Sequence, residues 1–306
     1  MGWKMIELCE HTLLLNAILG LVQKHNTYPC ILAEKGYQLE CICPSFLNHK
    51  GKEINPDIIL KSHSENNLLL GDCKTGTMQK EQALCYKDIT IEEIKEQNIT
   101  SLSGNITIDK TSICLERNLP KILEKDKEWE VGLNIICKFD SGLLKKADSI
   151  KFHSSILEDL FSRGVQLPQF TPTVYYQFSP EDPEEYILMH ILPAILYLSL
   201  NLNKTFFTLE ELLLQTHSLY AYLDEKEKTK LKSRVNNILS NLERTDLKES
   251  INRIPNQPNS WEVIKNRVLS FRNKCQTLIK EYQTFLQKEN EAKKQKKIFD
   301  SYPKEK

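Results

Sequence analysis

The chain has 306 residues, of which 40% are hydrophobic and 27% are charged, and its 41 basic residues balance its 41 acidic residues. This composition is typical of a folded globular protein with room for two domains, and it excludes disorder as the main state. The balanced charge excludes a global field that would draw the protein to nucleic acid or to a membrane, so any basic surface must be local.

Neither a secretory signal nor a membrane span is expected. The first residues, MGWKMIELCEH, place acids and a histidine where a signal peptide needs an apolar core. The apolar run over 186–202 is shorter than the roughly 20 residues of a spanning helix and contains His190 and Pro193, so it predicts a buried helix. Nine cysteines without a CxxC pair are typical of reduced thiols, and we therefore expect a cytoplasmic protein.

The N-terminal half predicts a compact α/β unit. Apolar residues recur on one face over residues 3–25, which indicates a helix, and a second helix is expected over 77–90, where TMQKEQALCYKDI contains neither glycine nor proline. A polar turn, KSHSEN, indicates a hairpin of the strands on either side of it. The strands expected in this half are CILAE (30–34), YQLECIC (37–43), NPDIIL (55–60), the leucine run 67–73, NITIDKTSICL (105–115) and WEVGLNIICKF (129–139).

A stretch rich in proline and aromatic residues begins near residue 165 and precedes an almost wholly helical half. The pattern predicts two domains, 1–165 and 166–306. Helices are expected at 184–201, at 208–223 with a capping box from Thr208 to Glu211, at 226–243 and at 260–290. The lysine-rich end of the chain is expected to fray.

Two acids and an amine stand at the ends of the predicted hairpin strands. Asp72 and Lys74 project from the same face as Leu68 and Leu70, and Asp57 lies on the preceding strand. Two carboxylates held close together repel each other unless a cation lies between them, and Mg²⁺ prefers such oxygen ligands. The sequence therefore predicts a divalent metal site, beside which Lys74 could orient a water and stabilise charge on a phosphate.

These residues carry a resemblance to a known family. Pro-Asp at 56–57 followed by D-C-K at 72–74 resembles the PD-(D/E)XK nuclease superfamily, whose restriction-endonuclease-like αβββαβ core is similar to the predicted element order. Gln82 and Tyr86 stand one helical turn apart and resemble the Q-x-x-x-Y motif of the RecB-like branch. One departure is Asp72, where glutamate is commoner in the family.

The resemblance implies a Mg²⁺- or Mn²⁺-dependent deoxyribonuclease that leaves a 5′-phosphate. Asp57, Asp72, the backbone carbonyl of Cys73 and a glutamate of the first helix would hold the metal. Lys74 would position the attacking water, and Gln82 and Tyr86 would steady the site or the nucleic-acid backbone. The helical pattern favours Glu10 over Glu7 for the glutamate, because Glu10 lies on the apolar face, and Glu34 and Glu40 are weaker alternatives.

The C-terminal half resembles a winged helix, with two helices followed by a polar hairpin that ends in an apolar strand within NSWEVI. Cations crowd the start of its second helix and are candidates for contacts with DNA phosphates. The alternative is a solvated helix face, since Asp224, Glu225 and Glu227 dilute the charge. These cations are Lys226, Lys228, Lys230, Lys232 and Arg234.

Three functions are compatible with these patterns. The first is a metal-dependent DNA nuclease of restriction, defence or repair, acting as a homodimer or within a partner complex. The second is a DNA-binding or regulatory protein with an inactive nuclease-like fold, and the third is a partner-binding subunit. The Asp57, Asp72 and Lys74 set favours the nuclease, because an inactive site has no reason to keep two repelling acids beside a lysine.

Overall fold

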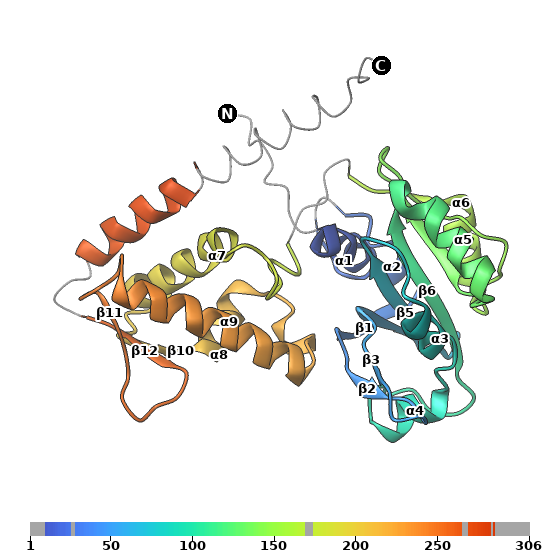
Figure 1. Ribbon diagram of the computed structural model, residues 1–306, viewed down its shortest axis with the longest axis horizontal. Helices are drawn as coiled ribbons and strands as arrows, with labels where there is room; N and C mark the ends of the chain where they lie inside the picture. The colour runs from blue at the N-terminus through green and yellow to red at the C-terminus, as the bar shows by residue number, and fades with distance from the viewer. Residues whose placement is uncertain (1–9, 26–27, 169–173, 265–268, 283, 285–306) are drawn as a thin grey trace, which may run out of the picture. The chain divides into compact units, whose positions relative to one another are not determined.

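The computed structural model describes residues 10–25, 28–168, 174–264, 269–282 and 284 (Figure 1). These residues form two compact units. The N-terminal unit comprises Glu10–Tyr176 with Ala221–Lys228, and the C-terminal unit comprises Gln177–Tyr220 and the described residues from Thr229 onward. The division therefore falls after Tyr176 and not at residue 165, because Tyr175 and Tyr176 both donate their backbone N–H to the Asn16 side chain.

A seven-stranded mixed sheet, in the order β1-β4-β5-β6-β7-β8-β9, is the centre of the N-terminal unit. The first three strands pair antiparallel, β6 and β7 follow parallel to β5, and β8 and β9 return antiparallel. A separate hairpin joins β2 (Phe46–Leu47) to β3 (Glu53–Ile54). The sheet strands are β1 (Tyr37–Ile42), β4 (Ile58–Ser62), β5 (Asn67–Lys74), β6 (Thr107–Leu115), β7 (Asn134–Lys138), β8 (Leu143–Lys146) and β9 (Val165–Gln166).

Helices cover both faces of this sheet, and Figure 1 shows α1 and α5 on opposite sides of it. The α1 helix is apolar around most of its circumference and contacts β1, β5 and β6, which is why it is buried. On the other face, Leu68 and Leu70 of β5 pack with Tyr86 of α3 and Ile122 of α5. The helices are α1 (Glu10–Val22), α2 (Ile31–Glu34), α3 (Lys80–Lys87), α4 (Ile91–Glu96), the 3₁₀ turn η1 (Glu116–Asn118), α5 (Leu119–Trp129) and α6 (Ser155–Arg163).

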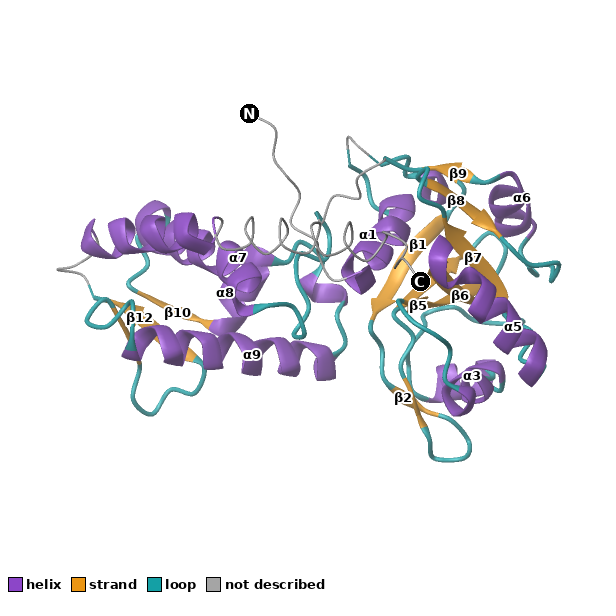
Figure 2. Cartoon of the chain, turned by 45° about the horizontal axis from the view of Figure 1, so that its top comes forward, coloured by secondary structure: helices purple, strands orange, loops and turns teal. Residues whose placement is uncertain are grey.

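The C-terminal unit is mostly helical and carries a small antiparallel sheet in the order β10-β12-β11 (Figure 2). The capping box expected at Thr208 and Glu211 is confirmed, and it begins α8. The last described residues, 269–282 and 284, are helical. The elements from α7 onward are α7 (Glu184–Leu196), the π-helical η2 (Tyr197–Asn201), β10 (Phe206–Thr208), α8 (Leu209–Thr216), η3 (Tyr220–Tyr222), α9 (Glu225–Arg244), β11 (Ile251–Arg253) and β12 (Ser260–Val263).

Several sequence-based assignments differ from the structure. CILAE is wrong as a strand, because Ile31–Glu34 forms α2, and Trp129 closes α5, so the strand expected at 129–139 begins only at Asn134. The helix expected at 260–290 is wrong at its start, where Ser260–Val263 pairs with both β10 and β11. The start of the first helix, at residues 3–9, and the lysine-rich tail lie outside the described residues.

The apolar run over 186–202 forms most of α7 and η2 and packs within the C-terminal unit. Its residues Ile187, Ile191 and Ile195 have no exposed surface. No helix in the described part of the chain is long and apolar enough to cross a membrane.

Gly71 is required by the close packing of β5 between its two neighbours. A Cβ atom at this position would lie 2.8 Å from Ile58 Cγ2 and 2.9 Å from Ile113 Cδ1. We expect Gly71→Ala to lower the free energy of unfolding by about 1–3 kcal/mol in urea denaturation, because branched side chains on both neighbouring strands must shift. Gly76→Ala is the matched control, since a Cβ there meets nothing within 4 Å. Equal stability of the two variants would contradict this account.

Candidate active site

The strand register brings Asp57 and Asp72 to the same end of the β4–β5 hairpin, as the sequence predicts. Asp57 directly precedes β4 and donates its backbone N–H to the Gly71 carbonyl at 2.9 Å. Ile58 pairs with Gly71 in an antiparallel ladder, so Asp57 stands opposite Asp72. The two carboxylates are largely shielded from solvent, with side-chain exposures of 16% for Asp57 and 10% for Asp72.

Asp57 is held through both of its carboxylate oxygens. Oδ2 accepts the backbone N–H of Cys73 at 2.5 Å, and Oδ1 lies 2.8 Å from His11 Nε2. The Cys73 side chain is buried, and burial holds the pKa of its thiol well above the usual range, so only the backbone of Cys73 serves the site. The structure thus adds His11, which the sequence analysis did not select.

Asp72 is held by Lys74, two residues further along the same face of β5. Lys74 Nζ lies 2.6 Å from Asp72 Oδ2 and donates to Gln82 Oε1 of α3 at 2.9 Å. Burial raises the pKa of Asp72 to about 6, against the lowering effect of Lys74, and the nearby charge of Asp57 raises it further. The contact with Gln82 joins β5 to α3 and fixes the lysine amine beside the acids.

Two buried hydroxyls near the acids have no hydrogen-bond partner within the described structure. Tyr86 is fully buried on α3, one turn after Gln82, and burial together with Asp72 and Asp57 raises the pKa of its hydroxyl well above the usual range. Ser112 is buried on β6, where the parallel register sets it beside Asp72. A buried hydroxyl without a partner is costly, so both are suited to bind a group that enters the site.

Glu10 is the glutamate that the sequence favours for the metal site, and its described partner is a cation. It is the first residue of α1, its carboxylate pairs with the Arg117 guanidinium of η1, and the neighbouring residue His11 reaches Asp57. Of the alternatives, Glu40 pairs with Lys61, Glu34 lies in α2, and Glu7 is outside the described residues. In the described structure Glu10 and Glu40 are therefore each paired with a basic side chain.

The comparison with known families covers this whole site. The family described as the MJECL32 domain matches residues 10–176, which is more than half of the chain. The chain belongs to the MJECL32 domain family. The match ends where the N-terminal unit passes into the C-terminal unit, and it includes Asp57, Asp72 and Lys74.

Beyond the MJECL32 domain, residues 180–295 are similar to a domain of unknown function, DUF8601. No curated protein and no solved structure gives a significant match to the chain.

The predicted DNA-binding cations all lie on α9, and three of them have acidic partners. Lys226 pairs with Glu53, Lys228 with Glu225 at 2.7 Å, and Lys232 with Glu210. Lys230 is exposed, and Arg234 is partly buried with its Nε lacking a partner in the described structure. Contact between these three paired lysines and DNA would therefore have to compete with the acids.

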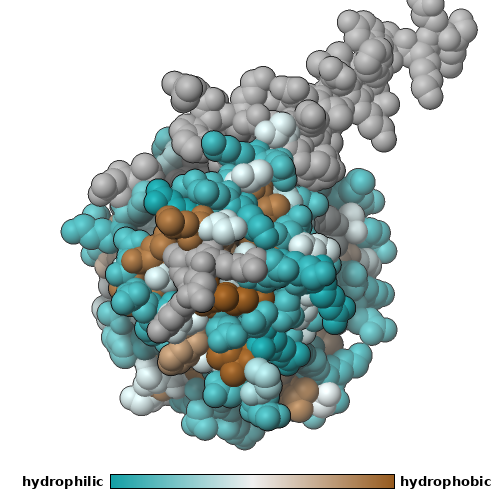
Figure 3. Space-filling view, turned by 90° about the vertical axis from the view of Figure 1, so that its left-hand side faces the viewer, coloured by the Kyte–Doolittle hydropathy of each residue, from teal (hydrophilic) through white to brown (hydrophobic). Residues whose placement is uncertain are grey.

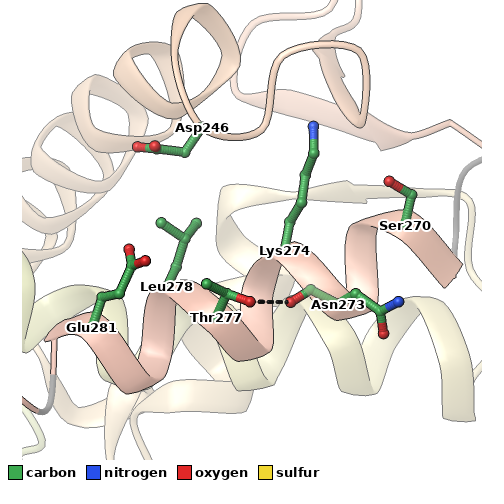
Figure 4. A pocket seen from close by; sticks show the side chains of 7 residues that line it. All are labelled: Asp246, Ser270, Asn273, Lys274, Thr277, Leu278 and Glu281. Carbon is green, nitrogen blue, oxygen red and sulfur yellow. Dashed lines mark hydrogen bonds between the residues drawn. The ribbon is translucent and has the colours of Figure 1, made fainter.

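The DUF8601-like region also contains a hollow of about 610 Å³, shown in Figure 4. Its charged residues are mixed in sign, with two acids and one lysine, so it concentrates neither positive charge for a phosphate nor carboxylates for a metal. It lies apart in the chain from the MJECL32 domain residues described above. The lining residues are Asp246, Ser270, Asn273, Lys274, Thr277, Leu278 and Glu281.

The raised pKa of Asp72 predicts a pH-dependent stability in the absence of divalent metal. The folded state holds this proton with a pKa of about 6 and the unfolded chain with one near 3.8, so the free energy of unfolding should fall as pH rises between these values and then level off. Asp72→Asn should abolish this fall, which amounts to about 3 kcal/mol, in urea denaturation with EDTA present.

Asp88→Asn is the matched control for this experiment. Lys50 lowers the pKa of Asp88, so ionisation of Asp88 contributes with the opposite sign, and removing the carboxylate should leave the fall between pH 4 and 6 in place. A fall of the same size in Asp72→Asn as in the unsubstituted protein would show that Asp72 is not its source.

Proposed function

We propose that the protein is a metal-dependent nuclease that hydrolyses phosphodiester bonds of DNA. The observation that carries this proposal is the contact set at the end of the β4–β5 hairpin, where Asp57 faces Asp72 and Lys74 bridges Asp72 to Gln82. The acids supply a site for a divalent cation, and the amine supplies a donor next to it.

The order of the elements supports a restriction-endonuclease-like core. Apart from the short α2, the β2–β3 hairpin and α4, the elements α1, β1, β4, β5, α3 and β6 follow one another in the chain. Strands β1, β4 and β5 pair antiparallel, and β6 is parallel to β5. This order is similar to the αβββαβ order of the PD-(D/E)XK superfamily, which supports the proposal. The Q-x-x-x-Y spacing of the RecB-like branch also fits, because Gln82 contacts the lysine and Tyr86 is buried beside the acids.

The residues present fit Mg²⁺ or Mn²⁺. Asp57, Asp72 and the Cys73 carbonyl would hold the ion, and the unpartnered hydroxyls of Tyr86 and Ser112 are suited to bind its waters. Mg²⁺ usually keeps several of its waters and is held by only one or two protein carboxylates. When bound, such an ion lowers the pKa of a coordinated water and balances the charge of the phosphate.

The remaining polar residues would position the reactants. Lys74 has a side-chain exposure of 14% and is fixed by two partners, so its amine can orient an attacking water without large movement. His11 would hold Asp57 in orientation from α1. Glu10, expected from the resemblance to bind the metal, is instead proposed to act through Arg117.

The C-terminal unit supports contact with DNA as a further part of this proposal. Its elements α7, β10, α8, the part of α9 from Thr229 onward, β11 and β12, with the sheet order β10-β12-β11, resemble a winged helix. In that arrangement α9 would be the recognition helix. The same unit would carry the binding function if the MJECL32 domain were an inactive scaffold.

A second candidate function is docking of a protein partner by the C-terminal unit. Figure 3 shows apolar side chains gathered on one face of this unit. Large apolar side chains exposed together are unusual on a monomer and are typical of interaction surfaces. The exposed apolar residues of this unit are Tyr197, Leu200, Leu202, Phe206, Leu214 and Leu269.

Cleavage assays test the nuclease directly. We expect the protein to cut DNA when Mg²⁺ or Mn²⁺ is present, and Asp72→Ala or Lys74→Ala to lower the rate by at least about 100-fold, because each removes a group that acts on the transition state. Linear, circular and single-stranded DNA and RNA, followed on gels, would identify the substrate.

Asp88→Ala and Lys50→Ala are matched controls, since they break a surface Lys–Asp pair of 2.8 Å in the same unit and should cut normally. The alternative outcome is that the unsubstituted protein and its Asp72→Ala and Lys74→Ala variants bind duplex DNA with equal affinity and that none of them cuts any substrate. That outcome would favour the binding-protein function.

Metal binding has a readout that is independent of cleavage. We expect Mn²⁺ or Mg²⁺ to raise the thermal unfolding temperature of the protein, because the ion binds the folded state and relieves the repulsion between Asp57 and Asp72. Asp72→Asn should lose most of this shift, and Asp88→Asn should keep it. An equal shift in both variants would place the ion elsewhere.

A further inference from the structure

Arg117 lies on the rim of the candidate active site. It belongs to η1, which directly follows β6, and β6 is parallel to β5 with Cys114 in register with Lys74. The chain therefore leaves β6 at the same end of the strands at which Asp72 and Lys74 lie on β5. The Asn118 side chain fixes this turn by donating to the carbonyl of Thr75, the residue after Lys74, at 2.9 Å.

A second anchor holds the guanidinium itself. Arg117 pairs with Glu10, and the next residue of α1, His11, contacts Asp57 at 2.8 Å. Arg117 is thus connected to both sides of the site, through Asn118 to the strand of Lys74 and through Glu10 to the helix that braces Asp57. The backbone N–H of Asp140, donating to Glu116 Oε2 at 2.9 Å, braces the same turn from the end of β7.

The pair between Arg117 and Glu10 is poorly explained as a stabilising contact. The Arg117 side chain is 56% exposed and that of Glu10 is 34% exposed. Ion pairs with this exposure contribute little to stability, because water screens them and both side chains must be ordered. A guanidinium held at the rim of a phosphodiester site has a second use, since its planar donors match the oxygens of a phosphate.

We propose that Arg117 binds a backbone phosphate of the substrate strand and that Glu10 is its counter-ion in the absence of substrate. This inference rests on the proposed nucleic-acid substrate. The phosphate takes the place of the Glu10 carboxylate on the guanidinium, so Arg117 is a substrate-binding residue and Glu10 competes with the substrate. Glu10 then orients the Arg117 guanidinium, and it is not needed to bind the metal ion.

The test measures binding apart from cleavage. Fluorescence anisotropy of a labelled DNA duplex and of its single strand is recorded for the full chain with Ca²⁺ in place of Mg²⁺, over a series of salt concentrations. Arg117→Gln should weaken binding about tenfold and reduce the slope of log affinity against log salt by about one. Arg117→Lys should recover the salt slope but only part of the affinity, because lysine keeps the charge and loses the bidentate geometry.

Glu10→Gln should bind as tightly as the unsubstituted protein or a few-fold more tightly, and it should still cut. The matched control is Arg163→Gln, which removes an exposed arginine from an ion pair with Asp159 on α6 and should change neither affinity nor slope. Unchanged affinity and salt slope in Arg117→Gln would overturn the inference, and so would loss of cleavage in Glu10→Gln, which would return Glu10 to the metal.

The outcomes also separate this inference from the nuclease proposal. Binding that depends on Arg117 in a protein that cuts nothing would support the phosphate contact and remove the nuclease. A protein that cuts DNA and whose binding does not change in Arg117→Gln would support the nuclease and remove the phosphate contact. A protein that neither binds nor cuts any of these nucleic acids would overturn both.

Discussion

The structure of the MJECL32 domain depends on one constraint, the placement of two shielded carboxylates opposite each other on paired strands. Antiparallel pairing of Ile58 with Gly71 sets Asp57 against Asp72, and the absence of a side chain at Gly71 lets β5 lie close to both neighbours. Like charges held this way must be neutralised or one of them must take up a proton. Lys74, 2.6 Å from Asp72, meets part of that requirement.

The two acids are treated differently by their surroundings. Asp57 receives the Cys73 N–H and contacts His11, whereas Asp72 relies on Lys74 and has its pKa raised to about 6. Asp57 is thus well satisfied in the protein alone, and Asp72 is only partly compensated. Under the proposed function, the partly compensated Asp72 and the two hydroxyls without a partner in the described structure would receive the hydrated cation.

The sequence was sufficient to predict contacts between residues that are close in the chain, and insufficient to predict contacts between residues far apart in it. The leucine run, the polar turn and the one-turn spacing of Gln82 and Tyr86 are short-range signals, and the elements β4, β5 and α3 agree with them. His11 contacts Asp57 across 46 positions, and Glu10 meets Arg117 across a larger interval, so no periodicity reports either pair.

The predictions for short segments were wrong for a related reason, since the structure of a short segment depends on what it pairs with. CILAE is compatible with a strand or one helical turn, and Ser260–Val263 became a strand because β10 and β11 both pair with it.

If the protein acts on nucleic acid as proposed, its charge limits how it can bind that substrate. The chain as a whole is neutral, Lys74 is engaged by Asp72 and Gln82, and three of the lysines of α9 are paired with acids. Non-specific attraction to nucleic acid grows with the number of phosphates neutralised, so a neutral surface of this kind captures DNA weakly at physiological salt. Under the proposed function, selection of a substrate would then come from a few cations that exchange an acidic partner for a phosphate. The Arg117–Glu10 pair is exposed and contributes little to stability, so a preference among strands would come from the fit of the guanidinium to the phosphate oxygens.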